Sequence, residues 1–263
     1  MKINFYETIK KKKTYINPNL AKHGIEVPFR MVIASGSGTG KSHSLCRLIY
    51  EFGKTWHEIH ICAPCCDEPL YNMLEERLNT PKHKGVIFHE NEEIPNLMDY
   101  AIIQPDGKLK QKDELQRLIV FDDYMVNKKV NKQIADFFLR GRKVGFCSVY
   151  ISQNFYQIPR DVSVNTQMFM FGQHIQESDI KDILRKFSVR LDNDKFVEIY
   201  DILTSEPLDT ILINTKKKTL VRNIVEEKYL FNNAKNCMLS YNTIIQHGEH
   251  GVSSDCEQES SRG

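Results

Sequence analysis

The chain has 263 residues, of which 41% are hydrophobic and 27% are charged. This composition is that of an ordinary folded protein and excludes a wholly disordered or collagen-like chain. The 36 basic and 34 acidic side chains leave a formal net charge of +2, which neither indicates nor excludes a nucleic-acid partner. No apolar run approaches about 18 residues, so we expect no membrane-spanning helix.

Residues 1–28 are polar and basic, and we interpret them as an arm that leads into the fold. The lysine run at 10–13 is not followed by an apolar segment, so we do not expect a secretory signal here. A short apolar strand is predicted at 29–34. A glycine-rich loop follows it, and then an amphipathic helix at 42–52.

Strands and helices continue to alternate along the chain. Further short apolar strands are predicted at 58–63, 86–88, 118–121, 146–152 and 168–171. Helices are predicted at 70–78, 94–103 and 129–139, and a polar loop at 105–116. This alternation is typical of an α/β fold in which helices cover both faces of a mostly parallel sheet.

The pattern changes after Gly172. Two amphipathic helices and the two strands of a hairpin are predicted next, at 176–187, 192–203, 210–214 and 219–222. We therefore interpret residues 29–172 as the core and residues 173–245 as a small C-terminal α+β extension. Residues 246–263 offer little to bury and are expected to form a disordered tail.

The seven cysteines are an odd number, which suggests free thiols in a reducing compartment. Cys62, Cys65 and Cys66 form a CxxCC cluster. A structural zinc site normally needs a second ligand pair at suitable spacing, and none follows. A zinc site is therefore not the favoured interpretation.

One segment matches the phosphate-binding pattern GxxxxGK[ST], with serine in place of the first glycine: Ser35-Gly36-Ser37-Gly38-Thr39-Gly40-Lys41-Ser42. Glycines let consecutive backbone N–H groups point into one concavity, at which the next helix also directs its positive end. Lys41 would reach the β- and γ-phosphates of ATP, and the Ser42 hydroxyl would bind Mg²⁺. The alternative is a chance glycine-rich turn, but the flanking strand and helix are those that the motif requires.

Two acids, Asp122 and Asp123, directly follow the apolar strand at 118–121. Ligands in open α/β sheets bind at the carboxyl ends of the strands. We therefore predict that Asp122 holds Mg²⁺ and that Asp123 polarises the attacking water. Many such enzymes have glutamate at the second position, so Asp123 is a departure. The alternative is an acid pair that only caps the strand.

Two further residues flank the strand at 146–152. Gln153 follows it and can donate a hydrogen bond to a γ-phosphate, or it can simply begin a polar loop. Arg142 precedes it in a basic cluster with Arg140 and Lys143. In a ring, Arg142 could reach the nucleotide of the adjacent subunit as an arginine finger. The alternative is a solvated basic helix end.

Together these segments resemble the viral genome-packaging ATPases, the poxvirus-type branch of the FtsK/HerA P-loop NTPase superfamily. The likeness covers residues 29–172, and its most specific parts are the Asp-Asp ending and the stretch GRKxGF…YxSQNFYxIPR. It implies a RecA-like core with an additional strand between the strand before the phosphate loop and the strand that carries Asp122. It also implies Mg²⁺-dependent ATP hydrolysis coupled to translocation of double-stranded DNA into a preformed capsid.

By position, the resemblance makes Lys41, Asp123, Gln153 and Arg142 the catalytic residues. It further implies a hexameric or similar homo-oligomeric ring, a capsid or portal-vertex partner and no membrane association. The expected location is the viral factory of the host cytoplasm, or the virion. Three alternatives stay open: another FtsK/HerA-type DNA pump for conjugation or DNA-end processing, a nucleotide kinase, and a non-catalytic ATP-dependent scaffold.

Overall fold

The computed structural model describes residues 15–81, 83–91, 93–124, 128–173, 175, 177–186, 193–226, 228–231 and 238–240. The lysine run at 10–13 and the tail predicted at 246–263 lie outside the described residues. The prediction of a disordered tail therefore stays a prediction.

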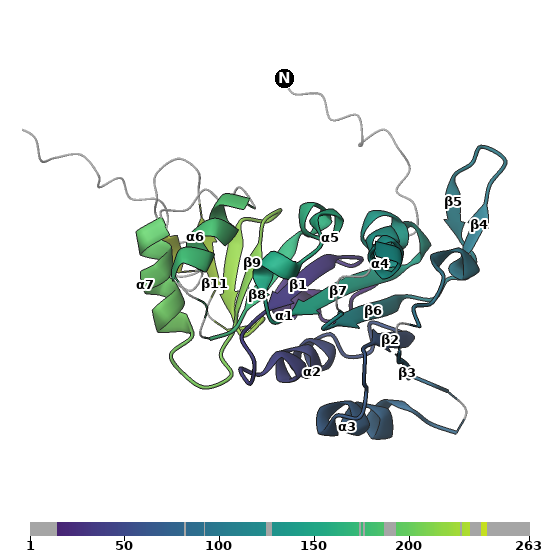
Figure 1. Ribbon diagram of the computed structural model, residues 1–263, viewed down its shortest axis with the longest axis horizontal. Coiled ribbons are helices and arrows are strands. Elements are labelled where there is room, and N and C mark those ends of the chain that lie inside the picture. Colours follow the sequence, from purple (N-terminus) through teal and green to yellow (C-terminus); the bar gives the residue numbers. More distant parts are fainter. Residues whose placement is uncertain are drawn as a thin grey trace, which may run out of the picture.

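Ten strands form the main sheet of the described chain (Figure 1). Six neighbours run parallel in the order β8-β1-β7-β6-β2-β3. They are β1 (Arg30–Ala34), β2 (Glu58–Cys62), β3 (Val86–His89), β6 (Arg117–Asp122), β7 (Phe146–Ser152) and β8 (Met168–Phe171). Strand β7 lies between β1 and β6, which confirms the additional strand that the resemblance implied.

Antiparallel strands continue this sheet beyond β8. They are β9 (Ile211–Asn214), β10 (Thr219–Arg222), β11 (Lys228–Phe231) and β12 (Met238–Ser240). The predicted C-terminal hairpin is therefore β9 and β10, and it lengthens the main sheet.

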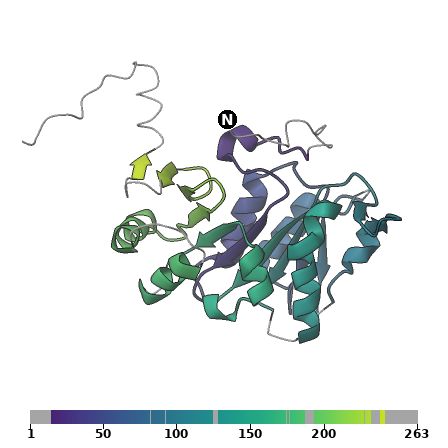
Figure 2. The same cartoon turned by 90° about the horizontal axis from the view of Figure 1, so that it is seen from above.

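Helices cover both faces of the parallel part of the sheet, as predicted (Figure 1). On one face lie α2 (Lys41–Glu51) and α3 (Pro69–Leu78). On the other lie α4 (Lys128–Arg140), α5 (Arg160–Asn165), α6 (Glu177–Lys186) and α7 (Asn193–Leu203), seen from above in Figure 2. In the described part of the chain, three short 3₁₀ helices span Leu97–Tyr100, Gly141–Val144 and Phe155–Gln157. None of the described helices is long and apolar enough to cross a membrane.

The parallel strands are buried on both sides because successive side chains point to opposite faces. In β1, Val32 and Ala34 join the apolar cluster under α4, whereas Met31 and Ile33 join the cluster under α2. This two-sided burial explains why these strands are continuous apolar runs. The fold is a mostly parallel α/β sheet with helices on both faces, as predicted.

The helix predicted at 94–103 was wrong. The structure has a 3₁₀ turn at Leu97–Tyr100, followed by β4 (Ala101–Ile103). The polar loop predicted at 105–116 contains β5 (Leu109–Gln111), which pairs antiparallel with β4. The cause is the turn at Pro105-Asp106-Gly107, in which Gly107 has φ +75°, because this turn folds the flanking residues into a hairpin. The hairpin projects from the body in Figure 1.

The described part of the N-terminal arm packs against the core. It contains the short helix α1 (Leu20–His23), and the His23 ring stacks on Phe52 at the end of α2 with centroids 4.1 Å apart. Burial lowers the pKa of His23 to about 4. His23 is therefore neutral at pH 7 and serves as a packing residue.

Candidate nucleotide-binding site

The phosphate-binding segment connects β1 to α2, as the sequence predicted. Two of its glycines adopt backbone angles that L side chains rarely tolerate, with φ +72° at Gly38 and +87° at Gly40. These angles turn the chain from the strand into the helix, so that the first turn of α2 faces the loop. The segment therefore has the backbone geometry of an anion-binding loop.

Ser35, which replaces the usual first glycine, is buried, and its hydroxyl hydrogen-bonds the Thr39 hydroxyl across the loop. Thr39 in turn donates to the Gly36 carbonyl at 2.7 Å. Gly172, at the end of β8, lies so close that a methyl group there would overlap the Ser35 hydroxyl. Ser35 is thus accommodated because its neighbour is glycine.

This fit predicts a rescue experiment. Gly172→Ala is expected to destabilise the protein by about 1–3 kcal/mol, because the loop cannot move away from an added methyl group without losing its hydrogen bonds. The double variant Ser35→Gly, Gly172→Ala removes the overlapping hydroxyl and is expected to recover most of the loss. Thermal unfolding measures the stability of each variant, and nucleotide affinity measures whether its phosphate loop is still intact. A double variant as impaired as Gly172→Ala would show that Ser35 is not the obstacle.

Lys41 begins α2 and turns back over the loop, where its Nζ donates to the Gly36 carbonyl at 2.9 Å. Burial lowers the pKa of Lys41, while the charges of Asp122, Asp123 and Glu68 act in the opposite direction. The ammonium group is therefore held among carboxylates at the place where the motif would present it to phosphates.

Asp122 is the last residue of β6 and is 8% exposed. The Tyr71 hydroxyl, from α3, donates a hydrogen bond to its Oδ2. Burial raises the pKa of Asp122 to about 6, an effect that the Tyr71 hydrogen bond opposes and that Glu68 and Asp123 reinforce. A buried carboxylate with this many acidic neighbours is suited to hold a cation.

Asp123 is exposed and has φ +52°, a left-handed conformation that aspartate tolerates better than most residues. Gln153, at the end of β7, donates from Nε2 to Asp123 Oδ2 at 2.7 Å. The structure therefore brings these two predicted catalytic residues together at the carboxyl edge of the sheet, beside the phosphate loop.

Sequence reasoning missed two residues of this site, Glu68 and Tyr71. The Ser42 hydroxyl donates to Glu68 Oε2 at 2.8 Å, and Tyr71 contacts Asp122 as described. A signal for Glu68 was present, because Asp67 and Glu68 lie in the loop that follows the carboxyl end of the buried strand β2. Nothing in the sequence pattern indicated Tyr71, which reads as an ordinary core residue of α3.

A family model described as "Poxvirus A32 protein" matches residues 19–253 of the chain. The chain belongs to the poxvirus A32 protein family. This confirms the poxvirus-type resemblance found in the sequence.

Curated poxvirus proteins are similar to this chain at low identity. It is 24% identical over 188 residues to the DNA packaging protein OPG160 of variola virus, a match that covers 68% of this chain and 63% of that protein. The monkeypox virus protein of the same name is 25% identical over 198 residues, covering 72% of this chain and 60% of its own length. The chain thus spans a little under two thirds of the length of these relatives.

A solved structure, the DNA-packaging ATPase B204 from Sulfolobus turreted icosahedral virus, superimposes with a TM-score of 0.48 at 12% sequence identity. The match covers 79% of this chain and 98% of that one.

In this A32-family chain, the side chains at the phosphate loop fit a Mg²⁺ ion. Ser42 and Asp122 offer a hydroxyl and a carboxylate, and Glu68 offers a second carboxylate next to Ser42. Hard oxygen ligands of this kind, together with phosphate oxygens, are those that Mg²⁺ prefers. The acidic cluster also faces Lys41, so the site is built for a ligand that carries both negative phosphates and a cation.

Two further features border the phosphate loop. Leu208, between α7 and β9, lies against Gly40, so the C-terminal extension touches the loop directly. A cavity of about 400 Å³ opens beside Ser35 and Gly36, and its other walls include Gln153 and Tyr156. The phosphate loop is therefore enclosed by the core on one side and by the extension on the other.

Arg142 does not lie near this site. It is exposed in the 3₁₀ turn before β7, whereas Gln153 follows the opposite end of that strand. Seven strand residues separate the two ends, a distance of about 20 Å at 3.3 Å per residue. Arg140 is engaged nearby in an ion pair with Asp136 at 2.7 Å. Arg142 therefore cannot reach the phosphate loop of its own chain.

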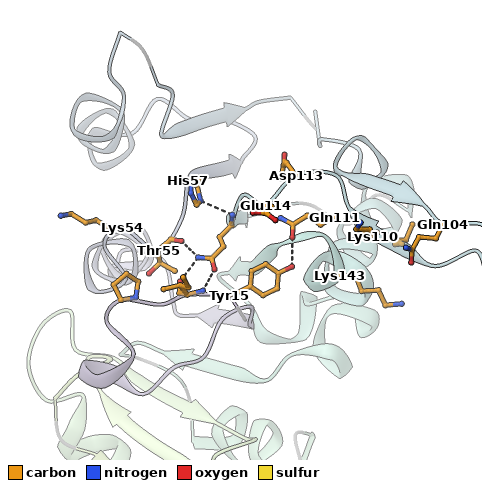
Figure 3. A pocket seen from close by; sticks show the side chains of 14 residues that line it. Tyr15, Lys54, Thr55, His57, Gln104, Lys110, Gln111, Asp113, Glu114 and Lys143 are labelled. Carbon is orange, nitrogen blue, oxygen red and sulfur yellow. Dashed lines mark hydrogen bonds between the residues drawn. The ribbon is translucent and has the colours of Figure 1, made fainter. Parts of the chain in front are cut away.

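A larger cavity, of about 750 Å³, lies at this amino-terminal edge of the sheet (Figure 3). The arm forms part of its wall: Tyr15 donates from its hydroxyl to Gln111 Oε1 at 2.9 Å, and Gln116 Nε2 donates to the Ile16 carbonyl at 2.8 Å. The predicted nucleotide-binding residues are at the other edge of the sheet, so this cavity is separate from the phosphate loop.

Proposed function

We propose that this chain is an ATP-hydrolysing motor that translocates double-stranded DNA into a preformed capsid. The observation that carries the proposal is the hydrogen-bonded pair of Asp123 and Gln153, beside a phosphate loop and the buried carboxylate of Asp122. A carboxylate held by an amide in this position suits proton transfer from an attacking water. Membership of the poxvirus A32 family, whose curated relatives are named DNA packaging proteins, supports the DNA substrate.

In this proposal, the backbone of residues 36–40 and the Lys41 ammonium hold the phosphates. Ser42 and Asp122 hold Mg²⁺, which neutralises charge on the phosphate oxygens when it is bound. Asp123 takes the proton of the attacking water, and Gln153 orients Asp123 through the 2.7 Å hydrogen bond. Gln153 also lines the cavity beside the loop, where it can respond to the presence of the γ-phosphate.

We further propose a homo-oligomeric ring, hexameric or similar, that docks on a capsid or portal-vertex component in the viral factory of the host cytoplasm. Head-to-tail interfaces of a ring join two different faces of the subunit. A residue that completes a neighbour's site should therefore lie away from its own nucleotide, as Arg142 does. The division into a core at 29–172 and an extension at 173–245 is part of the same proposal.

The proposed function is tested by the ATPase rate of the purified protein with and without linear double-stranded DNA. A several-fold increase with DNA is expected of a translocating motor. Phosphoryl transfer to an added nucleoside or nucleotide, with no response to DNA, would instead identify a kinase. The Lys41→Ala protein serves as the background control, because any contaminating ATPase would persist in it.

The ring interface gives a separate prediction about Arg142. Arg142→Ala is expected to keep ATP affinity near that of the wild type and to lose about 10³-fold in turnover, because the missing arginine acts on the neighbouring site. Mixing it with Lys41→Ala protein should restore part of the activity, since some interfaces then pair an intact loop with an intact arginine. No recovery in mixtures that demonstrably co-assemble would exclude Arg142 as the finger and leave Arg160 as the next residue to test.

A further inference from the structure

The end of the loop between β2 and α3, together with the first turn of α3, reaches both of the residues predicted to bind magnesium. Glu68 accepts the hydrogen bond of the Ser42 hydroxyl at 2.8 Å, and Tyr71 donates to the Asp122 carboxylate. Glu68 also lies near enough to Lys41 and Asp122 to affect the pKa of each. The start of α3 is thus in contact with every polar group of the predicted cation site.

The fold places Glu68 there for local and non-local reasons. Locally, Pro69 begins α3, and the Glu68 carbonyl accepts from the Tyr71 and Asn72 backbone N–H groups at 2.9 and 3.0 Å. The side chain of Tyr71 is fully buried, which fixes the first turn of the helix against the sheet. Non-locally, β2 pairs with β6, so the loop after β2 lies beside the carboxyl end of β6.

The charges at this site are unbalanced without a cation. The carboxylates of Asp122, Asp123 and Glu68 all act on the ammonium group of Lys41, and those of Glu68 and Asp123 also act on Asp122. Like charges held close together repel one another, as the effect of Glu68 and Asp123 on Asp122 shows. A triphosphate without a metal would add negative charge to this cluster, whereas Mg²⁺ would screen it.

We infer that Glu68 is a second carboxylate of the magnesium site, beside that of Asp122, and that it makes the phosphate loop select the nucleotide in its Mg²⁺-bound form. In the nucleotide-free chain Glu68 holds the Ser42 hydroxyl in place. When Ser42 turns to the cation, the Glu68 carboxylate is left within reach of the waters that the cation keeps, and it repels a nucleotide that arrives without one. This inference rests on the proposed function only in requiring that a nucleotide binds at the loop.

Binding of a non-hydrolysable ATP analogue, measured with Mg²⁺ and with EDTA, tests the inference without any turnover. The informative quantity is the factor by which Mg²⁺ tightens binding. In Glu68→Gln this factor is expected to fall about tenfold or more, mainly because the analogue binds better in EDTA. In Glu68→Asp, which keeps the charge, it should stay within about threefold of the wild type.

Glu76→Gln is the matched control. Glu76 is exposed in α3, about two turns beyond Glu68, and its replacement should leave the factor unchanged. A second readout is the affinity of the nucleotide-bound protein for Mn²⁺, followed by its electron paramagnetic resonance signal, which should weaken in Glu68→Gln. An unchanged factor in Glu68→Gln, or an equal loss of affinity with Mg²⁺ and EDTA, would overturn the inference. A protein that shows the expected binding but no ATPase activity would contradict the proposed function and leave the role of Glu68 intact.

Discussion

Replacing Lys41 with alanine is expected to abolish ATP turnover and to weaken nucleotide binding strongly. The ammonium group lies over the loop, 2.9 Å from the Gly36 carbonyl, and alanine leaves no positive side chain at the phosphates. Removing one preorganised group that stabilises developing charge typically costs about 10²–10³-fold in rate. Steady-state ATPase assays and equilibrium nucleotide binding measure the two effects separately.

The control for this variant is Lys132→Ala, which removes an exposed lysine from α4 and should leave turnover unchanged. Unfolding is not expected to explain the loss, since Lys41 is only half-buried and its main hydrogen bond is to the loop itself. Wild-type turnover in a folded Lys41→Ala protein would show that the phosphate loop is not the catalytic site.

The second large effect is expected for Asp123→Asn, which should bind Mg²⁺ and ATP normally and hydrolyse ATP about 10²–10⁴-fold more slowly. The amide oxygen can still accept the hydrogen bond of Gln153, but the amide cannot take a proton from water. Asparagine also tolerates the left-handed backbone at this position, φ +52°, so the variant changes the chemistry and preserves the geometry. Alanine at position 123 would change the chemistry and the backbone geometry together, so the two effects could not be separated.

Asp122→Asn is the comparison for this experiment, because it is expected to impair the metal-dependent part of nucleotide binding. Single-turnover hydrolysis and binding of a non-hydrolysable analogue distinguish the two variants. If Asp123→Asn turned over at the wild-type rate while Asp122→Asn did not, another group would activate the water. Glu68, next to Ser42, would then be the first to examine.

Most of the core could be predicted from the sequence because its signals are local. The apolar runs at β6 and β7 and the amphipathic α6 and α7 fall within a few residues of the predicted bounds. The failure at 94–103 has a specific cause. The apolar residues there suggest a helix face, but the turn at Pro105–Gly107 indicates an extended hairpin, β4–β5.

The residues of the site also divide into those with a local sequence signal and those without one. The phosphate loop, Asp122, Asp123 and Gln153 could be predicted because each follows a buried strand and carries a characteristic side chain. Arg142 was identified as a basic residue before a strand, and the structure adds that it lies at the opposite edge of the sheet from its own phosphate loop. Its role depends on a neighbouring subunit and stays a prediction.

The sequence by itself determined that the chain forms a phosphate loop between a buried strand and a helix, because that motif is contiguous and its glycines, lysine and serine act within one turn of each other. Only the tertiary structure decided which other residues meet it. Tyr71 and Asp122 are 51 positions apart and Glu68 and Ser42 are 26 apart, and no sequence pattern links them. Their contacts depend on β2 pairing with β6, and on the packing of Tyr71 into the core beneath α3. Strand order is set by how whole elements bury their apolar faces against one another, so the acidic partners of the loop emerge only when the sheet is assembled.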